Sequence, residues 1–204
     1  MTRSKKNNPA VLVGLQYRGR LSLGENRTRL GPAAFHWSII IRIPTHQQQF
    51  HRFDVTDGIV MNEAGTEDLN PRREWVFRHQ ASSTFAEIPR YLGAVEIGTL
   101  LPPSTTPDGA EAFFKALPLP RTDADPEENC VSWVCDAARA LQEAGRSSGQ
   151  FEVEDFMDFA LHHTDERIKD FTSQSDIVEY CPQGQRNSVF QAILRRARSF
   201  KESS

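Results

Sequence analysis

Residues 35–43, FHWSIIIRI, decide the fold, because they combine aromatic and β-branched side chains in one short run. This composition predicts a β-strand, and Pro44 predicts its end. In the next run, Phe50 to Thr56, residues 50, 52 and 54 alternate with residues 51, 53 and 55, as expected for the two faces of a half-buried strand. The polar residues 45–49 between the two runs predict a turn, so we expect the strands to pair as a hairpin.

Shorter runs on both sides extend this hairpin into a sheet. Further strands are expected at residues 11–17, 75–79 and 94–100, and a long loop or hairpin at 19–32. Helices are expected at residues 109–117, 126–144, 151–161 and 187–200. Strands come first and helices last, which predicts an α+β fold with a small antiparallel β-sheet followed by helices. We expect one domain over residues 10–204, preceded by a disordered basic tail at residues 1–9.

The composition predicts a soluble, cytoplasmic protein with reduced thiols. The chain has 204 residues, a net charge of −3 and three cysteines without disulfide-framework spacing. No apolar run suits a signal peptide or reaches the ~20 residues of a membrane span. Neither glycine-rich phosphate loops nor zinc-ligand spacings occur, so we expect no cofactor and no metal. The charge excludes a polycation, and any nucleic-acid contact requires a local basic patch.

The expected helix over residues 126–144 carries a cysteine near its start. Asp125 could cap this helix and form a capping box with Glu128, which places Cys130 in the second turn. Asn129 could cap it instead, which places Cys130 in the first turn. There, the helix dipole and free backbone N–H groups lower the pKa of a thiol and offer an oxyanion site. The sequence leaves both alternatives open.

His36 is the leading candidate for a base beside this thiol. It begins a strand whose remainder is almost wholly apolar, so its imidazole should lie at the end of the sheet. The four acidic residues between positions 123 and 128 oppose a thiolate, which makes a nearby imidazolium more necessary. The neighbouring strand offers Asp54, and alternatively His51, to orient His36. Asp54 lies in an otherwise apolar run, where its charge requires a partner.

These residues resemble the circularly permuted papain-like fold, which includes the permuted relatives of the NlpC-type peptidases and the lecithin retinol acyltransferase family. His36-Trp37 matches the histidine strand, and Asn129-Cys130 matches the Asn-Cys pair of the acyltransferases. The resemblance implies a Cys130 nucleophile, with His36 as base. Two departures count against a phospholipid substrate. Val-Ser-Trp follows Cys130 instead of Glu-His-Phe, and the last four residues are polar.

A second resemblance suggests a substrate. The chain is similar to fungal proteins with a His-Trp strand, an Arg-x-Asp strand (here 52–54) and a Cys-x-x-Trp-Val helix (here 130–134), near which we place the fungal arginine-containing cyclodipeptide synthases. Those enzymes take amino acids from charged tRNA. Such a partner requires basic residues for the RNA backbone. The predicted tRNA-binding residues are Arg186, Arg195, Arg196, Arg198 and Lys201, with a smaller cluster at Arg72, Arg73 and Arg78.

Together these patterns predict an acyltransferase that works through a thioester on Cys130 and forms amide bonds. Trp37, Asn129 and Trp133, next to the two reactive positions, are predicted to bind the substrate. A thiol amidohydrolase or peptidase is the alternative enzyme. The alternative of another class is an inactive interaction module on the same fold, because a cysteine on an apolar helix face commonly serves only packing. Cys135 is assigned to packing.

Overall fold

The computed structural model describes residues 8–44, 49–88, 90–169 and 177–180. Its strands are β1 (Ala10–Tyr17), β2 (Phe35–Ile43), β3 (Gln49–Thr56), β4 (Val76–Ser82), β5 (Tyr91–Thr99) and β6 (Ile177–Glu179). They form one sheet in the order β4-β3-β2-β1-β5-β6. All pairs are antiparallel except β5 with β6, which is parallel. The predicted α+β class with an antiparallel sheet is confirmed, and the parallel β6 is an addition to it.

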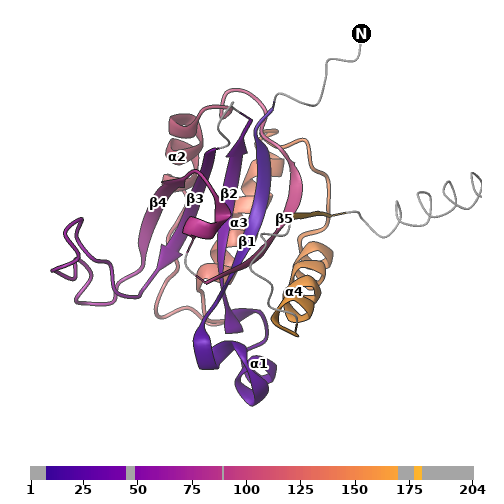
Figure 1. Ribbon diagram of the computed structural model, residues 1–204. Helices are drawn as coiled ribbons and strands as arrows, with labels where there is room; N and C mark the ends of the chain where they lie inside the picture. Colours follow the sequence, from indigo (N-terminus) through magenta and orange to yellow (C-terminus); the bar gives the residue numbers. More distant parts are fainter. Residues whose placement is uncertain (1–7, 45–48, 89, 170–176, 181–204) are drawn as a thin grey trace, which may run out of the picture.

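The helices cover the two faces of this sheet unequally. The α-helices are α1 (Gly24–Leu30), α2 (Pro107–Lys115), α3 (Cys130–Glu143) and α4 (Val153–Lys169), and short 3-10 helices occur at η2 (Gly19–Ser22), η3 (Gly31–Ala34) and η4 (Phe85–Glu87). Figure 1 shows α3 behind the strands. We call the face against α3 the inner face and the opposite one the outer face.

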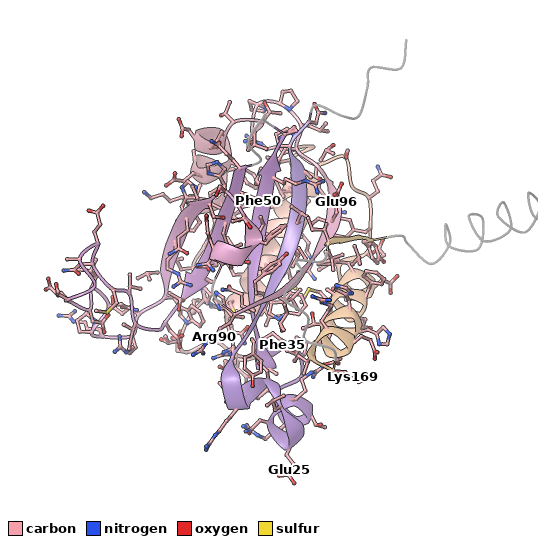
Figure 2. All side chains as sticks on the ribbon, viewed as in Figure 1. Glu25, Phe35, Phe50, Arg90, Glu96 and Lys169 are labelled. Atoms are coloured by element: carbon pink, nitrogen blue, oxygen red, sulfur yellow. The ribbon has the colours of Figure 1, made fainter. Side chains whose placement is uncertain are left out.

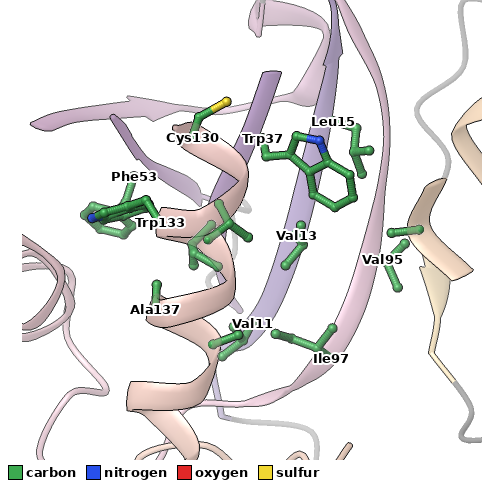
Figure 3. Packing of buried hydrophobic residues seen from close by; sticks show 14 of the residues in the cluster. Val11, Val13, Leu15, Trp37, Phe53, Val95, Ile97, Cys130, Trp133 and Ala137 are labelled. Atoms are coloured by element: carbon green, nitrogen blue, oxygen red, sulfur yellow. The ribbon is translucent and has the colours of Figure 1, made fainter. Parts of the chain in front are cut away.

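The inner face holds the main hydrophobic core. Alternate residues of β2, including Trp37 and Ile39, pack there against Val134 and Ala137 of α3. Figure 3 shows side chains of this cluster, Trp37 and Ala137 among them, between the helix and the strands. A second, smaller cluster lies on the outer face and includes Leu12, Ile40, Phe50, Phe85 and Ile88. Both faces are therefore buried at the centre of the sheet, which explains why β1 is apolar at nearly every position.

The hairpin of β2 and β3 opens at one end. Its pairing runs from Ile43↔Gln49 to Ile39↔Phe53 and stops there. The residues beyond that point pair with the outer neighbours instead, 35–38 with β1 and 54–56 with β4. Figure 2 labels Phe35 at this open end and Phe50 toward the other end. A side chain from the start of α3 can therefore approach between the two strands.

Residues 19–34 differ from the predicted loop or hairpin, since they form η2, α1 and η3. Gly19, Gly24 and Gly31 have positive φ angles and divide the segment into short helical turns. The Ser22 hydroxyl closes the segment, because it donates to Ala34 O (2.6 Å) and accepts from Arg18 N (2.8 Å). Helices this short are not stable by themselves, so they depend on hydrogen bonds to other parts of the chain.

Helix α4 is longer than the predicted 151–161. Its polar second half is held by partners from distant parts of the chain. Arg27 forms a bidentate pair with Asp165 (2.6 and 2.8 Å), and Arg167 donates to Leu92 O (3.2 Å). Within the described ranges, every helix is too short or too polar to cross a lipid bilayer. The predicted helix 187–200 and residues 1–7 of the predicted tail lie outside the described residues.

Candidate active site

Helix α3 begins at Cys130, and Asn129 is its cap. The Asn129 side chain accepts from Val131 N (2.8 Å), and Asn129 N donates to the Ser132 hydroxyl (2.9 Å), which completes a capping box. The alternative start at Pro126 is wrong, because Glu128 is turned to Arg121 (2.7 Å) instead of capping the helix. Cys130 therefore lies in the first turn, where the helix dipole favours a negative charge on sulfur.

This cap can be tested by substitution. Asn129→Ala is expected to lower the free energy of unfolding by about 1 kcal/mol, because the Val131 amide loses its partner. Asp125→Ala is the matched control and should change it by much less. Urea denaturation measures both. An equal loss in the two variants would contradict the assignment of the cap.

Cys130 is buried, with 4% of its surface exposed. Figure 3 shows its sulfur at the end of α3, beyond the apolar side chains of the core. Burial alone would raise the pKa of the thiol. The hydrogen bond and charge of His36 outweigh burial, and the Trp37 backbone and the charge of Arg18 add to them, so the pKa of Cys130 is lowered. The site therefore favours the thiolate.

His36 lies between this thiol and a carboxylate. Its Nε2 is 3.2 Å from Asp54 Oδ2, and its ring also forms a hydrogen bond with the side chain of Cys130. Burial alone would lower the pKa of His36. The hydrogen bond to Asp54, followed by the interaction with Cys130, overcomes burial and raises it to about 9. The two shifts together favour a thiolate–imidazolium pair.

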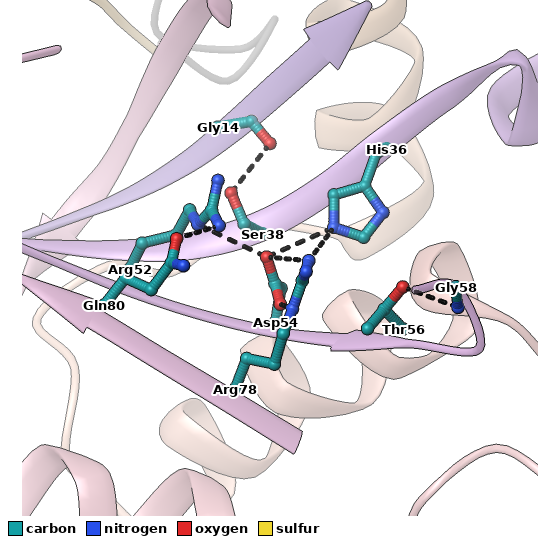
Figure 4. A network of polar contacts seen from close by, with 9 residues as sticks. All are labelled: Gly14, His36, Ser38, Arg52, Asp54, Thr56, Gly58, Arg78 and Gln80. Atoms are coloured by element: carbon teal, nitrogen blue, oxygen red, sulfur yellow. Dashed lines mark hydrogen bonds and ion pairs between the residues drawn. The ribbon is translucent and has the colours of Figure 1, made fainter. Parts of the chain in front are cut away.

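Asp54 is fully buried and faces three cationic side chains (Figure 4). Arg78 donates to both carboxylate oxygens, at 2.7 Å from Nε and 3.0 Å from Nη2. The Nε of Arg52 is 3.3 Å from Oδ2, beside the contact with His36. Burial would raise the pKa of Asp54, but these partners hold it well below its usual range. An ionised Asp54 can therefore orient the imidazole of His36.

Sequence reasoning missed the roles of Arg52 and Arg78. The sequence pattern groups Arg78 with Arg72 and Arg73, but the structure separates the three. Arg73 binds Asp68, and Arg72 lies 3.9 Å from Glu74. The signal for Arg78 is the register of β3 with β4, which places it directly opposite Asp54. A pairing between strands cannot be read from either strand alone.

The structure does not bring His51 to this site. Successive residues of a strand face opposite sides, so His51 lies on the inner face and Asp54 on the outer face. His51 Nδ1 is 3.0 Å from His79 Nε2, and His79 Nδ1 is 2.8 Å from Glu111 Oε2. Burial and the neighbouring His79 lower the pKa of His51. Of the two candidates for orienting His36, the geometry selects Asp54.

The structure buries both rings that are predicted to contact the substrate, those of Trp37 and Trp133, in the core. Trp37 is fully buried, with Nε1 donating to Pro32 O (2.8 Å), and its backbone forms a hydrogen bond with Cys130. Trp133 is 2% exposed and packs near Phe77 and Phe114, although one side of it borders a pocket of about 200 Å³ beside residues 118–121. The Asn129 side chain is occupied as the helix cap.

Several sequence candidates lie elsewhere. The predicted tRNA-binding residues Arg186, Arg195, Arg196, Arg198 and Lys201 are outside the described residues. Cys135 follows Cys130 on α3, but burial raises the pKa of its thiol to about 11. In the described part of the chain, His, Cys, Asp and Glu side chains form no group of three suited to a metal ion.

The chain was compared with known protein families, curated proteins and solved structures. No family model, no curated protein and no solved structure matches the chain. The chemistry proposed for the site therefore rests on the positions of Cys130, His36 and Asp54.

Proposed function

We propose that this protein is a Cys-His acyl-transfer enzyme of the permuted papain-like type. The observation that carries the proposal is the placement of Cys130, the first residue of α3, against a histidine whose other ring nitrogen faces a buried carboxylate. A helix start, an imidazole and an orienting carboxylate are the three parts that activate a thiol for attack on a carbonyl. In the proposed fold, the histidine strand precedes the cysteine helix, as it does in this chain.

The proposed reaction has two steps. The Cys130 thiolate attacks the carbonyl of the donor, and the backbone N–H of Cys130 helps to stabilise the oxyanion. His36 gives its proton to the leaving group, whose bond to the acyl carbon breaks, and the acyl group remains on sulfur as a thioester. An amine then attacks the thioester, His36 takes its proton, and the amide leaves with the thiolate restored.

The donor that we propose is a soluble activated acyl group, such as the aminoacyl ester of a charged tRNA, and the product is an amide. Hydrolysis shares the same thioester and differs only in the attacking group, which is water. Incubation of the enzyme with an acyl ester, with and without a primary amine, distinguishes the two. An amide product detected by mass spectrometry supports transfer, and free acid as the only product under both conditions assigns the protein to the thiol hydrolases.

The nucleophile is tested by comparing two cysteines of the same helix. At pH 7, iodoacetamide is expected to modify Cys130 at least about tenfold faster than Cys135, because the pKa of Cys130 is lowered and that of Cys135 is raised to about 11. Peptide mapping by mass spectrometry measures both rates in one sample. Cys130→Ala should abolish activity, and Cys135→Ala should retain it. Equal alkylation rates together with full activity of Cys130→Ala would show that Cys130 is not the nucleophile.

A further inference from the structure

A pocket lies on the outer face of the sheet beside the carboxylate that orients His36. It has a volume of about 360 Å³, within the range of small-ligand sites. Its lining residues are Arg52, Gln80, Ala81, Ser82, Glu87 and Ile88. Arg52 comes from β3, residues 80–82 come from β4, and the end of η4 forms the opposite wall. We call it the outer-face pocket.

Arg52 is the charged residue buried in this pocket. It is 5% exposed, and its guanidinium lies against the carboxylate of Asp54 and donates to Gln80 Oε1. That carboxylate is shared with Arg78 and His36, so one negative charge faces three cationic side chains. Asp54 by itself therefore compensates the positive charge of Arg52 only in part. A buried, partly compensated cation is costly, and an anion beside it offsets that cost.

We infer that the outer-face pocket binds an anionic group, a carboxylate or a phosphate, of one of the substrates. The inference rests on the proposed function, because the same Asp54 carboxylate contacts both Arg52 in the pocket and the proposed catalytic imidazole of His36. Arginine presents its N–H donors in a planar fork that matches both anions. Gln80 accepts from Arg52 through its oxygen, which leaves its NH₂ group as a further donor, and Ser82 adds a hydroxyl.

Glu87 is the opposing charge at the rim of the pocket. Both of its carboxylate oxygens are engaged by Ser83, at 2.9 Å from the backbone nitrogen and 2.9 Å from the hydroxyl. Its side chain is exposed, so solvent weakens its repulsion of an anion without removing it. This residue offers a substitution that should strengthen anion binding, in contrast to the substitutions that weaken it.

The experiment measures binding of inorganic phosphate and of acetate to the full chain by calorimetry at constant ionic strength. Glu87→Gln is expected to tighten binding about fivefold, because one like charge is removed. Ser82→Ala is expected to weaken it about fivefold through loss of one donor. Glu25→Gln in α1 is the matched control, which removes an equal charge elsewhere and should leave binding unchanged. Tighter binding of phosphate than of acetate identifies a phosphate group, and the reverse identifies a carboxylate.

Two results would overturn the inference. One is the absence of binding of either anion up to about 100 mM, well above common metabolite affinities. The other is binding that Glu87→Gln and Ser82→Ala leave unchanged, which indicates an adventitious ion only. Alkylation of Cys130 in the unsubstituted protein is measured in parallel. If Cys130 is reactive but neither anion binds, the inference about the pocket is wrong and the proposed function stands. If an anion binds but Cys130 is unreactive, the proposed function is wrong.

Discussion

His36→Ala is expected to slow the alkylation of Cys130 at pH 7 by about a hundredfold, and the acyl-transfer activity by about a hundredfold or more. Without the imidazolium, burial is the dominant influence on Cys130, and it raises the pKa of the thiol instead of lowering it. The thiol then stays protonated at neutral pH. The rate of iodoacetamide modification, followed by intact mass, measures the change.

The pH dependence of this rate has a definite sign. The pKa of His36 is raised to about 9, so the stability that its protonation contributes is fully present below its ordinary value of 6.5 and is lost as the pH rises through about 9. The pKa of Cys130 is lowered, so its thiolate is lost only as the pH falls through that lowered value. The ion pair is therefore present between the lowered pKa of Cys130 and a pH of about 9. We expect the pH midpoint of Cys130 alkylation to lie below the ordinary cysteine pKa of about 8.5 in the unsubstituted protein and above it in His36→Ala.

His51→Ala is the matched control for this experiment. It removes an imidazole from the same sheet, but on the inner face, where it contacts His79 and not Cys130. The pH profile of Cys130 should be unchanged in this variant. A Cys130 profile that is the same in His36→Ala and in the unsubstituted protein would show that His36 does not form the thiolate.

Asp54→Ala is expected to destabilise the folded protein by about 3–5 kcal/mol, the largest stability effect that we predict. The substitution removes the carboxylate from the buried Arg52 and from the half-buried Arg78 and His36. Surface ion pairs contribute far less, because water solvates the charges that remain after one partner is lost. Urea denaturation, monitored by tryptophan fluorescence, measures the loss.

Asp165→Ala is the control for this loss. Asp165 forms a bidentate pair with Arg27 at the surface, with 35% of its side chain exposed, and its removal should cost at most about 1 kcal/mol. Asp54→Asn keeps the shape of the side chain and should fall between the two. If Asp54→Ala and Asp165→Ala unfold at the same urea concentration, the buried charge cluster does not stabilise the fold as proposed.

Much of the sheet could be predicted, because its strands carry strong local signals. The predicted bounds of β2 agree with the structure, and those of β1 and β3 differ from it by one residue. These strands are recognisable because their residues are either apolar in one continuous run or alternate between the two faces of the sheet. Residues 19–34 and β6 were missed, because short helices and a three-residue strand depend on tertiary partners more than on composition.

The candidate site divides in the same way. The residues Cys130, His36 and Asp54 were predicted from the sequence, because a helix start, a strand start and a charge in an apolar strand are local features. Their meeting at one point depends on the tertiary structure. It requires the ladder of β2 and β3 to end at Ile39↔Phe53 and the start of α3 to approach the open end.

The sequence by itself determined the fold class, the strands of the central sheet and the three residues of the proposed catalytic group. Only the tertiary structure decided that Asn129 caps α3, that Asp54 rather than His51 faces His36, and that Arg52 and Arg78 share its carboxylate. The physical reason is that periodicity and composition act between neighbours in the chain. Burial, charge pairing and strand register act between residues that only the folded chain brings together.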